Sequence, residues 1–105
     1  MPNKPFTQKV YDLVATIPAG KVMTYGQVAT LVGSSGAARA VGMCMKHNPD
    51  TTVVPCHRVV SSDGSMTGYS AKGGIASKKK KLIAEGVIFK GDKVDISRSL
   101  FSPTS

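Results

Sequence analysis

Several residue types are scarce in this chain of 105 residues. It has no tryptophan, only three tyrosines and three phenylalanines, and two cysteines. Two cysteines are too few for a disulfide scaffold and favour a reducing compartment. No apolar run approaches the roughly 18 residues of a membrane span, and the first five residues lack the apolar core of a secretory signal. We therefore expect a cytoplasmic protein without a membrane partner.

Acidic residues are also scarce, and this sets the charge. Six acidic residues face 14 Lys and Arg, which leaves a formal net charge of +8 and a pI of about 9.8. Such an excess is typical of proteins that bind nucleic-acid phosphates, although lysines also keep small domains soluble. The run Lys78–Lys81 is expected to be mostly a solvated face. Glu85 is the only glutamate in the chain.

The length and the 41% of hydrophobic residues predict one domain with its own core. We place that domain at 1–105, with the core at about 6–96 and a flexible tail at 97–105. Apolar residues at helical spacing predict a first helix from Phe6 to Ile17, and Pro18 to Gly20 should stop it.

A helix-turn-helix is predicted in the next part of the chain. Thr24 and Gln27 have the spacing of a capping box, which starts a second helix, and Gly33 suits the left-handed position after its last turn. A third helix is expected from Ala37 to His47, capped by Ser35. It is rich in small residues, which permit close approach to a duplex or to a packed neighbour.

Sequence patterns in the second half of the chain predict short strands and one more helix. Val53-Val54 and Val59-Val60 are β-branched runs on either side of a reactive-looking tetrapeptide. A fourth helix is expected over 75–85, closed by Gly86. The pattern over 87–96 predicts a β-hairpin.

Cys56 lies in that tetrapeptide, Pro55-Cys56-His57-Arg58. The thiolate is the nucleophilic form of cysteine, and a neighbouring base or positive charge favours it. Adjacent residues on an extended chain point to opposite faces, so His57 reaches Cys56 only where the backbone turns or through a water. A carboxylate that orients the imidazole, with Glu85 as the only glutamate available, would complete a nucleophile–base–orienter relay.

The cysteines have two other interpretations besides a catalytic nucleophile. Cys44, on the apolar third helix, is expected to be a buried small hydrophobe. Together with His47, Cys56 and His57 it has the composition of a zinc site, but adjacent Cys56 and His57 suit a tetrahedral chelate poorly, so no metal is predicted. No phosphate-binding glycine motif follows a predicted strand, and no cofactor is predicted.

The motif Pro55-Cys56-His57-Arg58-Val59 resembles the active-site motif of the O6-alkylguanine-DNA alkyltransferases. The resemblance covers about residues 6–89 and implies a mainly α fold with small β elements, a winged-helix-like helix-turn-helix DNA-binding domain. Four further segments occur in that family's order and near its spacing, two before this motif and two after it: Ala38-Arg39-Ala40-Val41-Gly42, Met45-Lys46-His47-Asn48-Pro49, Tyr69-Ser70 and Glu85-Gly86.

The resemblance implies catalytic roles for four residues. Cys56 would take the alkyl group from guanine O6 by direct displacement, and each molecule would act once because the thioether does not leave. His57 would deprotonate Cys56 through a water, with Glu85 orienting the imidazole. Asn48 would bridge backbone turns beside the site.

The resemblance also implies a DNA surface and a pocket. Arg39 would occupy the space of the flipped nucleotide, Tyr25 would rotate its 3′ phosphate, and the third helix would dock in the minor groove. The implied DNA-binding residues are Arg39, Tyr25, Ala38, Gly42 and Lys46. The implied pocket residues are Met45, Val59, Tyr69 and Ser70.

The implied function is single-turnover repair of O6-alkylguanine in double-stranded DNA by a monomer, nucleoid-associated if bacterial. The resemblance covers the family's DNA-binding and catalytic domain and not its variable N-terminal domain, and it implies that Ala71-Lys72 is inserted in the loop after Tyr69-Ser70. Small size and the tail are similar to alkyltransferase-like proteins, which bind such lesions without repair and flag them for excision-repair proteins. Those usually carry Trp or Ala at the cysteine position, so Cys56 favours repair. A sequence-specific helix-turn-helix regulator is a third hypothesis. It is disfavoured because a helix of small residues with one arginine offers few side chains for sequence-specific DNA contacts.

Overall fold

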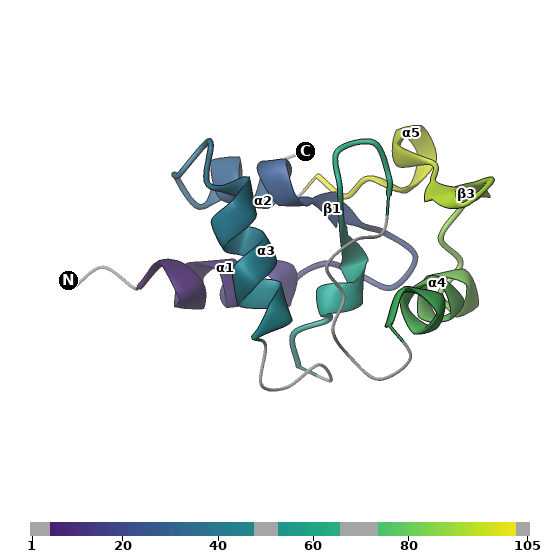
Figure 1. Cartoon of the computed structure of the whole chain (residues 1–105), viewed down its shortest axis with the longest axis horizontal. Coiled ribbons are helices and arrows are strands. Elements are labelled where there is room, and N and C mark those ends of the chain that lie inside the picture. Colours follow the sequence, from purple (N-terminus) through teal and green to yellow (C-terminus); the bar gives the residue numbers. More distant parts are fainter. Residues whose placement is uncertain (1–4, 48–52, 66–73, 103–105) are drawn as a thin grey trace.

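The computed structural model describes residues 5–47, 53–65 and 74–102, and it is mostly helical with short strands, as predicted (Figure 1). No helix in these three ranges is long and apolar enough to cross a membrane. The elements are α1 (Phe6–Val14), β1 (Met23–Thr24), α2 (Tyr25–Leu31), α3 (Ala38–Lys46), the 3₁₀ helix η1 (Cys56–Arg58), β2 (Val59–Val60), α4 (Gly74–Ala84), β3 (Phe89–Lys90), β4 (Lys93–Val94) and α5 (Ile96–Ser99).

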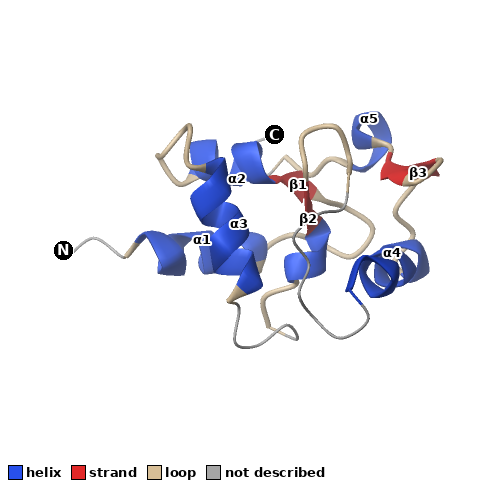
Figure 2. Ribbon diagram, viewed as in Figure 1, coloured by secondary structure: helices blue, strands red, loops and turns tan. Residues whose placement is uncertain are grey.

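Helices α1, α2 and α3 gather at one end of the molecule and α4, the hairpin and α5 at the other, with β1 and β2 between them (Figure 2). A core cluster lies under each group. The first includes Val10, Val28 and Cys56, and the second includes Leu82 and Val94. Because Cys56 belongs to the first cluster, the reactive tetrapeptide is packed into the interior rather than displayed on a loop.

Helix α1 follows the predicted apolar stripe but ends earlier than expected. It stops at Val14, and a turn follows in which the Ile17 amide donates to the Val14 carbonyl over 3.1 Å. Pro18 disfavours helical backbone at the residue before it, which explains why Ile17 lies outside the helix. Ile17 is nevertheless 1% exposed, so the stripe identified a core residue correctly.

The helix-turn-helix is formed by α2 and α3, which pack against each other. The capping box is confirmed, since the Gln27 amide donates to Thr24 Oγ1 over 3.0 Å. Gly33 has a φ of +86°, also as predicted. The predicted Ser35 cap is wrong. The residue that precedes α3 is Ala37, which makes no side-chain cap and packs against the first core cluster.

The strands are shorter than the sequence suggested. β1 and β2 pair in parallel, with Met23 opposite Val59. β3 and β4 form the expected antiparallel hairpin. Val53-Val54 is not a strand, because the Val54 carbonyl accepts from the Cys56 amide and the chain turns there.

The C-terminal segment differs from the flexible tail expected over 97–105. Ile96–Ser99 form α5, capped by Asp95. Leu100 then forms a parallel bridge with Val22. The segment is therefore held to the centre of the molecule as far as Phe101, whose amide donates to the Val22 carbonyl.

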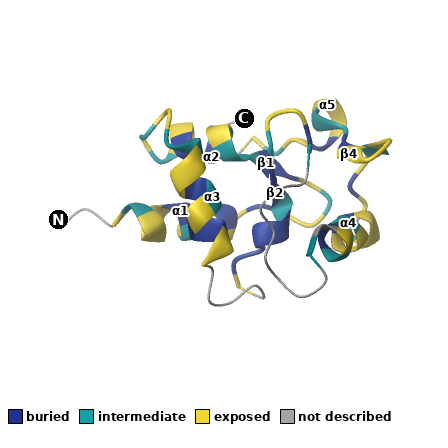
Figure 3. Ribbon diagram, viewed as in Figure 1, coloured by how far each residue is buried: buried dark blue, intermediate teal, exposed yellow. Residues whose placement is uncertain are grey.

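Helix α4 corrects the interpretation of the lysine run. Leu82 is fully buried, whereas its neighbour Ile83 is 54% exposed. Lys78, placed on a solvated face by the sequence, is 0% exposed. It lies one turn before Leu82, so both side chains share the face of α4 that packs inward (Figure 3).

Gly64 is a steric requirement of this fold. A Cβ at this position would lie 2.2 Å from the Val94 carbonyl oxygen, and its φ is +89°. We expect Gly64→Ala to lower the free energy of unfolding by about 2 kcal/mol or more, measured by urea denaturation. Gly33→Ala is the matched control, since φ is similar but the space is open, and it should cost only about 1 kcal/mol. Equal losses in the two variants would contradict this account.

Candidate active site

The backbone turns at Cys56. The sequence analysis required such a turn, or a bridging water, for His57 to reach the Cys56 thiol. The Cys56 amide donates to the Val54 carbonyl over 2.8 Å, and the Arg58 amide donates to the Pro55 carbonyl over 2.9 Å. These bonds wind Cys56–Arg58 into η1. Cys56 is 5% exposed, so its thiol is shielded from bulk water.

His57 and Glu85 are brought together as predicted. His57 Nε2 lies 3.0 Å from Glu85 Oε2, although the residues are 28 positions apart. Glu85 follows the last turn of α4, and Gly86 then reverses the chain with a φ of +92°. The end of α4 therefore delivers the carboxylate to the imidazole.

Arg58 completes this cluster, and the sequence analysis assigned it no role. Its Nε donates to Glu85 Oε1 over 2.9 Å and its Nη2 to Glu85 Oε2 over 2.6 Å. Its Nη1 donates to the Ile17 carbonyl over 2.8 Å. A partly buried glutamate needs a cationic partner, and this requirement could have pointed to Arg58, next to His57.

The cluster sets the protonation of both partners. Burial by itself raises the pKa of Glu85, but hydrogen bonds from Arg58 and His57 outweigh it and hold the pKa below the usual value. Burial lowers the pKa of His57, and the hydrogen bond with Glu85 offsets this only in part. Glu85 is thus ionised and His57 neutral at pH 7, a state in which the imidazole can accept a proton.

The second nitrogen of His57 is free for such a step. Nε2 is engaged with Glu85, while Nδ1 is buried and has no hydrogen-bond partner among the described residues. A buried polar atom without a partner is uncommon in proteins and marks sites of chemistry or bound water. Nδ1 is therefore the atom through which His57 can act as a base.

Lys78 is a further polar group beside the site. Its Nζ donates to the Val59 carbonyl over 2.7 Å and lies 5.8 Å from the centroid of the Tyr25 ring. Burial lowers the pKa of Lys78 to about 8, and the charge of a Cys56 thiolate opposes this shift. The i, i+4 spacing to Leu82 is a sequence signal for Lys78, but Lys79 has the same spacing to Ile83, so only the structure separates the two lysines.

Tyr25 borders the same site from the first turn of α2. Its ring packs against the core cluster that contains Cys56, and it is half-buried. Burial, reinforced by Cys56, raises the pKa of Tyr25 to about 12, so the hydroxyl keeps its proton. Met45 and Val59, the other predicted pocket residues in the described ranges, are buried in this cluster as well.

The predicted DNA-binding residues of α3 lie along an exposed face. Arg39 and Lys46 are exposed, and Ala38 and Gly42 are half-buried. A Cβ at Gly42 would meet nothing within 4 Å, so the backbone is open to close approach there. Four predicted features, Asn48, Tyr69, Ser70 and the Ala71-Lys72 insertion, lie outside the described residues.

The cysteines do not assemble a metal centre in the part of the chain described here. Cys44 is buried, with its Sγ 3.7 Å from Thr7 Oγ1, while His57 is engaged with Glu85. No group of three His, Cys, Asp or Glu side chains lies together in these residues.

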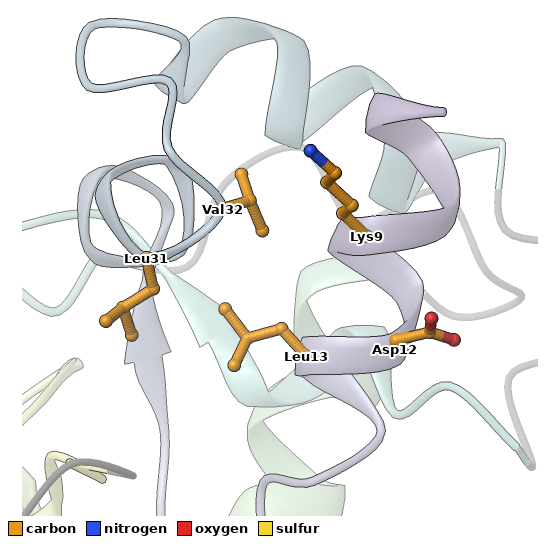
Figure 4. A pocket seen from close by; sticks show the side chains of 5 residues that line it. All are labelled: Lys9, Asp12, Leu13, Leu31 and Val32. Atoms are coloured by element: carbon orange, nitrogen blue, oxygen red, sulfur yellow. The ribbon is translucent and has the colours of Figure 1, made fainter. Parts of the chain in front are cut away.

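A separate pocket of about 380 Å³ lies between α1 and α2 (Figure 4). None of the predicted site residues lines it. Its lining residues are Lys9, Asp12, Leu13, Leu31 and Val32.

Comparison with known proteins places this geometry in a family. Residues 5–87 match the "6-O-methylguanine DNA methyltransferase, DNA binding domain" family. A methylated-DNA–protein-cysteine methyltransferase of Shigella flexneri is 49% identical over 84 residues, 80% of this chain and 48% of that protein. The protein of that name from Mycobacterium tuberculosis H37Rv is 46% identical, over 76% of this chain and 47% of its own length. The chain thus spans about half the length of these curated relatives.

Two solved structures resemble the fold. S. pombe Atl1, in complex with damaged DNA containing O6-carboxymethylguanine, has a TM-score of 0.82 and 39% identity, covering 98% of this chain and 100% of its own. Mycobacterium tuberculosis OGT in complex with DNA has a TM-score of 0.72 and 44% identity, covering 80% of this chain and 50% of its own.

These similarities run through the segments that carry Cys56, His57 and Glu85, which the fold brings to one place. The chain belongs to the family of the 6-O-methylguanine DNA methyltransferase DNA-binding domain.

Proposed function

We propose that this protein repairs O6-alkylguanine in double-stranded DNA by transferring the alkyl group to Cys56. The observation that carries the proposal is the buried Cys56 at a backbone turn, next to a neutral His57 that Glu85 and Arg58 hold in place. Relatives at 46–49% identity are named for the same transfer to a protein cysteine.

The chemistry follows from the protonation states. His57 Nδ1 accepts the thiol proton through a bridging water while Nε2 remains bonded to Glu85, which stabilises the imidazolium. The Cys56 thiolate attacks the alkyl carbon, a C–S bond forms, and the C–O6 bond breaks with its electron pair on guanine. The proton held by His57 then neutralises the guanine. The thioether is stable, so one protein molecule repairs one lesion.

Access to O6 requires DNA distortion. A base inside a duplex must be extruded, at a cost of a few kcal/mol. Arg39, on the exposed face of α3, would fill the vacated space, and contacts to the flanking phosphates would recover part of the cost. Gly42 leaves α3 open to a groove wall, and the net charge of +8 supports sequence-independent search.

The proposal includes the working state of the protein. It acts as a monomer on double-stranded DNA, without a cofactor, in the cytoplasm or on the nucleoid. Asn48, Tyr69 and Ser70 keep the roles that the family resemblance implies for them.

Lesion binding without transfer is the second candidate. The favouring observation is the match to Atl1 over 98% of this chain and 100% of the other. In that case excision-repair proteins are the partners. Transfer is preferred because this chain keeps a cysteine at position 56 beside a competent base.

The first test is transfer itself. Stoichiometric protein is incubated with a duplex that contains O6-methylguanine labelled in the methyl group, and the label is followed by peptide mapping. We expect about one label per protein, on Cys56, and none in Cys56→Ser. If the wild-type protein binds the lesion tightly but no label reaches it, the second candidate replaces this proposal.

The second test addresses the relay. Glu85→Gln removes the charge that orients His57 and stabilises its protonated form, so single-turnover transfer should slow by about 10- to 100-fold. Affinity for the lesion duplex should stay within about twofold, because Glu85 is not one of the predicted DNA-binding residues and the exposed face of α3 with Arg39 is unchanged. Asp92→Asn is the control, since it makes the same change at an exposed ion pair with Lys79. An unchanged rate in Glu85→Gln would remove Glu85 from the relay.

The third test addresses Lys78. Lys78→Met removes a buried positive charge together with its hydrogen bond to the carbonyl of Val59, in the strand that directly follows Cys56–Arg58. We expect single-turnover transfer and alkylation of Cys56 by iodoacetamide to slow by about tenfold, or ~1.4 kcal/mol. Lys80→Met, on the exposed side of the same helix, makes the same change in net charge. Equal rates in the two variants would show that burial of Lys78 is purely structural.

A further inference from the structure

The segment after the hairpin, Ile96–Phe101, returns to the centre of the molecule and touches the entry to α2. We propose that this segment, together with Gln27, is a positioning element for Tyr25; we call it the C-terminal clamp. The inference rests on the proposed function only in that Tyr25 is taken to contact lesion DNA. The segment lies beyond residues 5–87, the part that matches the family.

The clamp forms a parallel β-bridge, Leu100 to Val22, directly before β1. The Val22 amide donates to the Ser99 carbonyl and the Phe101 amide donates to the Val22 carbonyl, each over 2.8 Å. Val22 belongs to the extended segment that continues into β1. The next residue of that segment, Met23, pairs with Val59, which directly follows η1. The chain that enters α2 is thus held between the clamp and the strand that follows Cys56–Arg58.

Gln27 connects the clamp to the first turn of α2. Its Nε2 donates to the Phe101 carbonyl over 2.6 Å, while its Oε1 accepts from the Thr24 amide over 3.3 Å. The Gln27 amide donates in turn to Thr24 Oγ1. Both ends of one side-chain amide are therefore used, and Thr24, the residue before Tyr25, is held by two bonds to Gln27.

The clamp is itself anchored. Ser99 is 1% exposed, and its Oγ accepts from the Ile88 amide over 3.0 Å. Phe101 is half-buried and packs against the core cluster that contains Cys56. Hydrogen bonds and apolar contact at both ends fix the segment, so that it can resist movement of the backbone it holds.

Tyr25 is the residue that this arrangement controls. Its backbone follows Thr24 directly, and its ring lies under Lys78 Nζ on the side of the candidate active site. A shift of the β1–α2 junction would move the Tyr25 hydroxyl, whereas the His57–Glu85 contact is made by η1 and the residue after α4. The clamp should therefore affect binding of lesion DNA rather than the reactivity of the thiol.

Phe101→Pro tests this in the full chain. Proline removes the amide that donates to Val22 and leaves all charges unchanged. We expect the Kd for a duplex containing O6-methylguanine to rise about fivefold, the loss that one net hydrogen bond accounts for. The rate of Cys56 alkylation by iodoacetamide should remain that of the wild type. Phe101→Leu, which keeps the amide and an apolar side chain, should bind within about twofold of the wild type.

A double-mutant cycle separates positioning from general loss of stability. In a Tyr25→Ala background, Phe101→Pro should cause no further loss of affinity, because the residue on which the clamp acts is gone. A loss that persists in that background, or wild-type affinity in Phe101→Pro itself, would overturn the inference. If Phe101→Pro does not fold, Gln27→Met is put through the same cycle, since it removes the bond to the Phe101 carbonyl without a change in charge.

Hydrogen exchange tests the clamp without DNA. In Phe101→Pro the amides of Tyr25 to Gln27 should exchange about fivefold faster, and protection equal to the wild type would contradict the clamp. If wild-type protein fails to bind the lesion duplex, the proposed function fails, and exchange alone then decides whether the clamp holds the junction.

Discussion

The ion pair between Arg58 and Glu85 is the contact on which the rest of the site depends. It joins η1 to the end of α4, and a third bond from Arg58 reaches the Ile17 carbonyl in the turn after α1. Both side chains are about four-fifths buried, and charges in such places persist only when paired and hydrogen-bonded. Glu85 Oε2 also lies 3.0 Å from His57 Nε2, so the ion pair fixes the carboxylate that contacts the proposed base.

A second set of polar contacts surrounds the β1–α2 junction. Lys78 is buried against the Val59 carbonyl, Gln27 bridges Thr24 and Phe101, and Tyr25 lies between them. None of these groups is in the Cys56–His57–Glu85 relay. They form the wall of the site on the side of α2, where the proposed lesion contact lies. Of these groups, Lys78 is proposed to act on the Cys56 thiol, while Gln27 and Phe101 are proposed to act through Tyr25 on the binding of lesion DNA.

Local patterns predicted local structure well. The capping box of Thr24 and Gln27, the left-handed Gly33 and the inward face of α1 all depend on residues a few positions apart, and each formed as expected. The wrong predictions concern local structure that is determined by contacts between distant parts of the chain. Ser35 has the chemistry of a cap but does not cap α3, and Val53-Val54 has strand propensity but its backbone serves the turn at Cys56.

The sequence by itself determined the helix periods, the turn residues and the family, because these are carried by short motifs such as Pro55-Cys56-His57-Arg58. It also predicted a nucleophile, its base and a glutamate to orient that base, and the fold brings His57 and Glu85 into contact. Only the tertiary structure decided that Arg58 shares Glu85 with His57, that Lys78 is buried while its neighbours are not, and that Phe101 returns to α2. Each of these depends on contacts between residues 20 or more positions apart or on the burial of one face of a helix, and burial and pairing over such distances are properties of the packed chain.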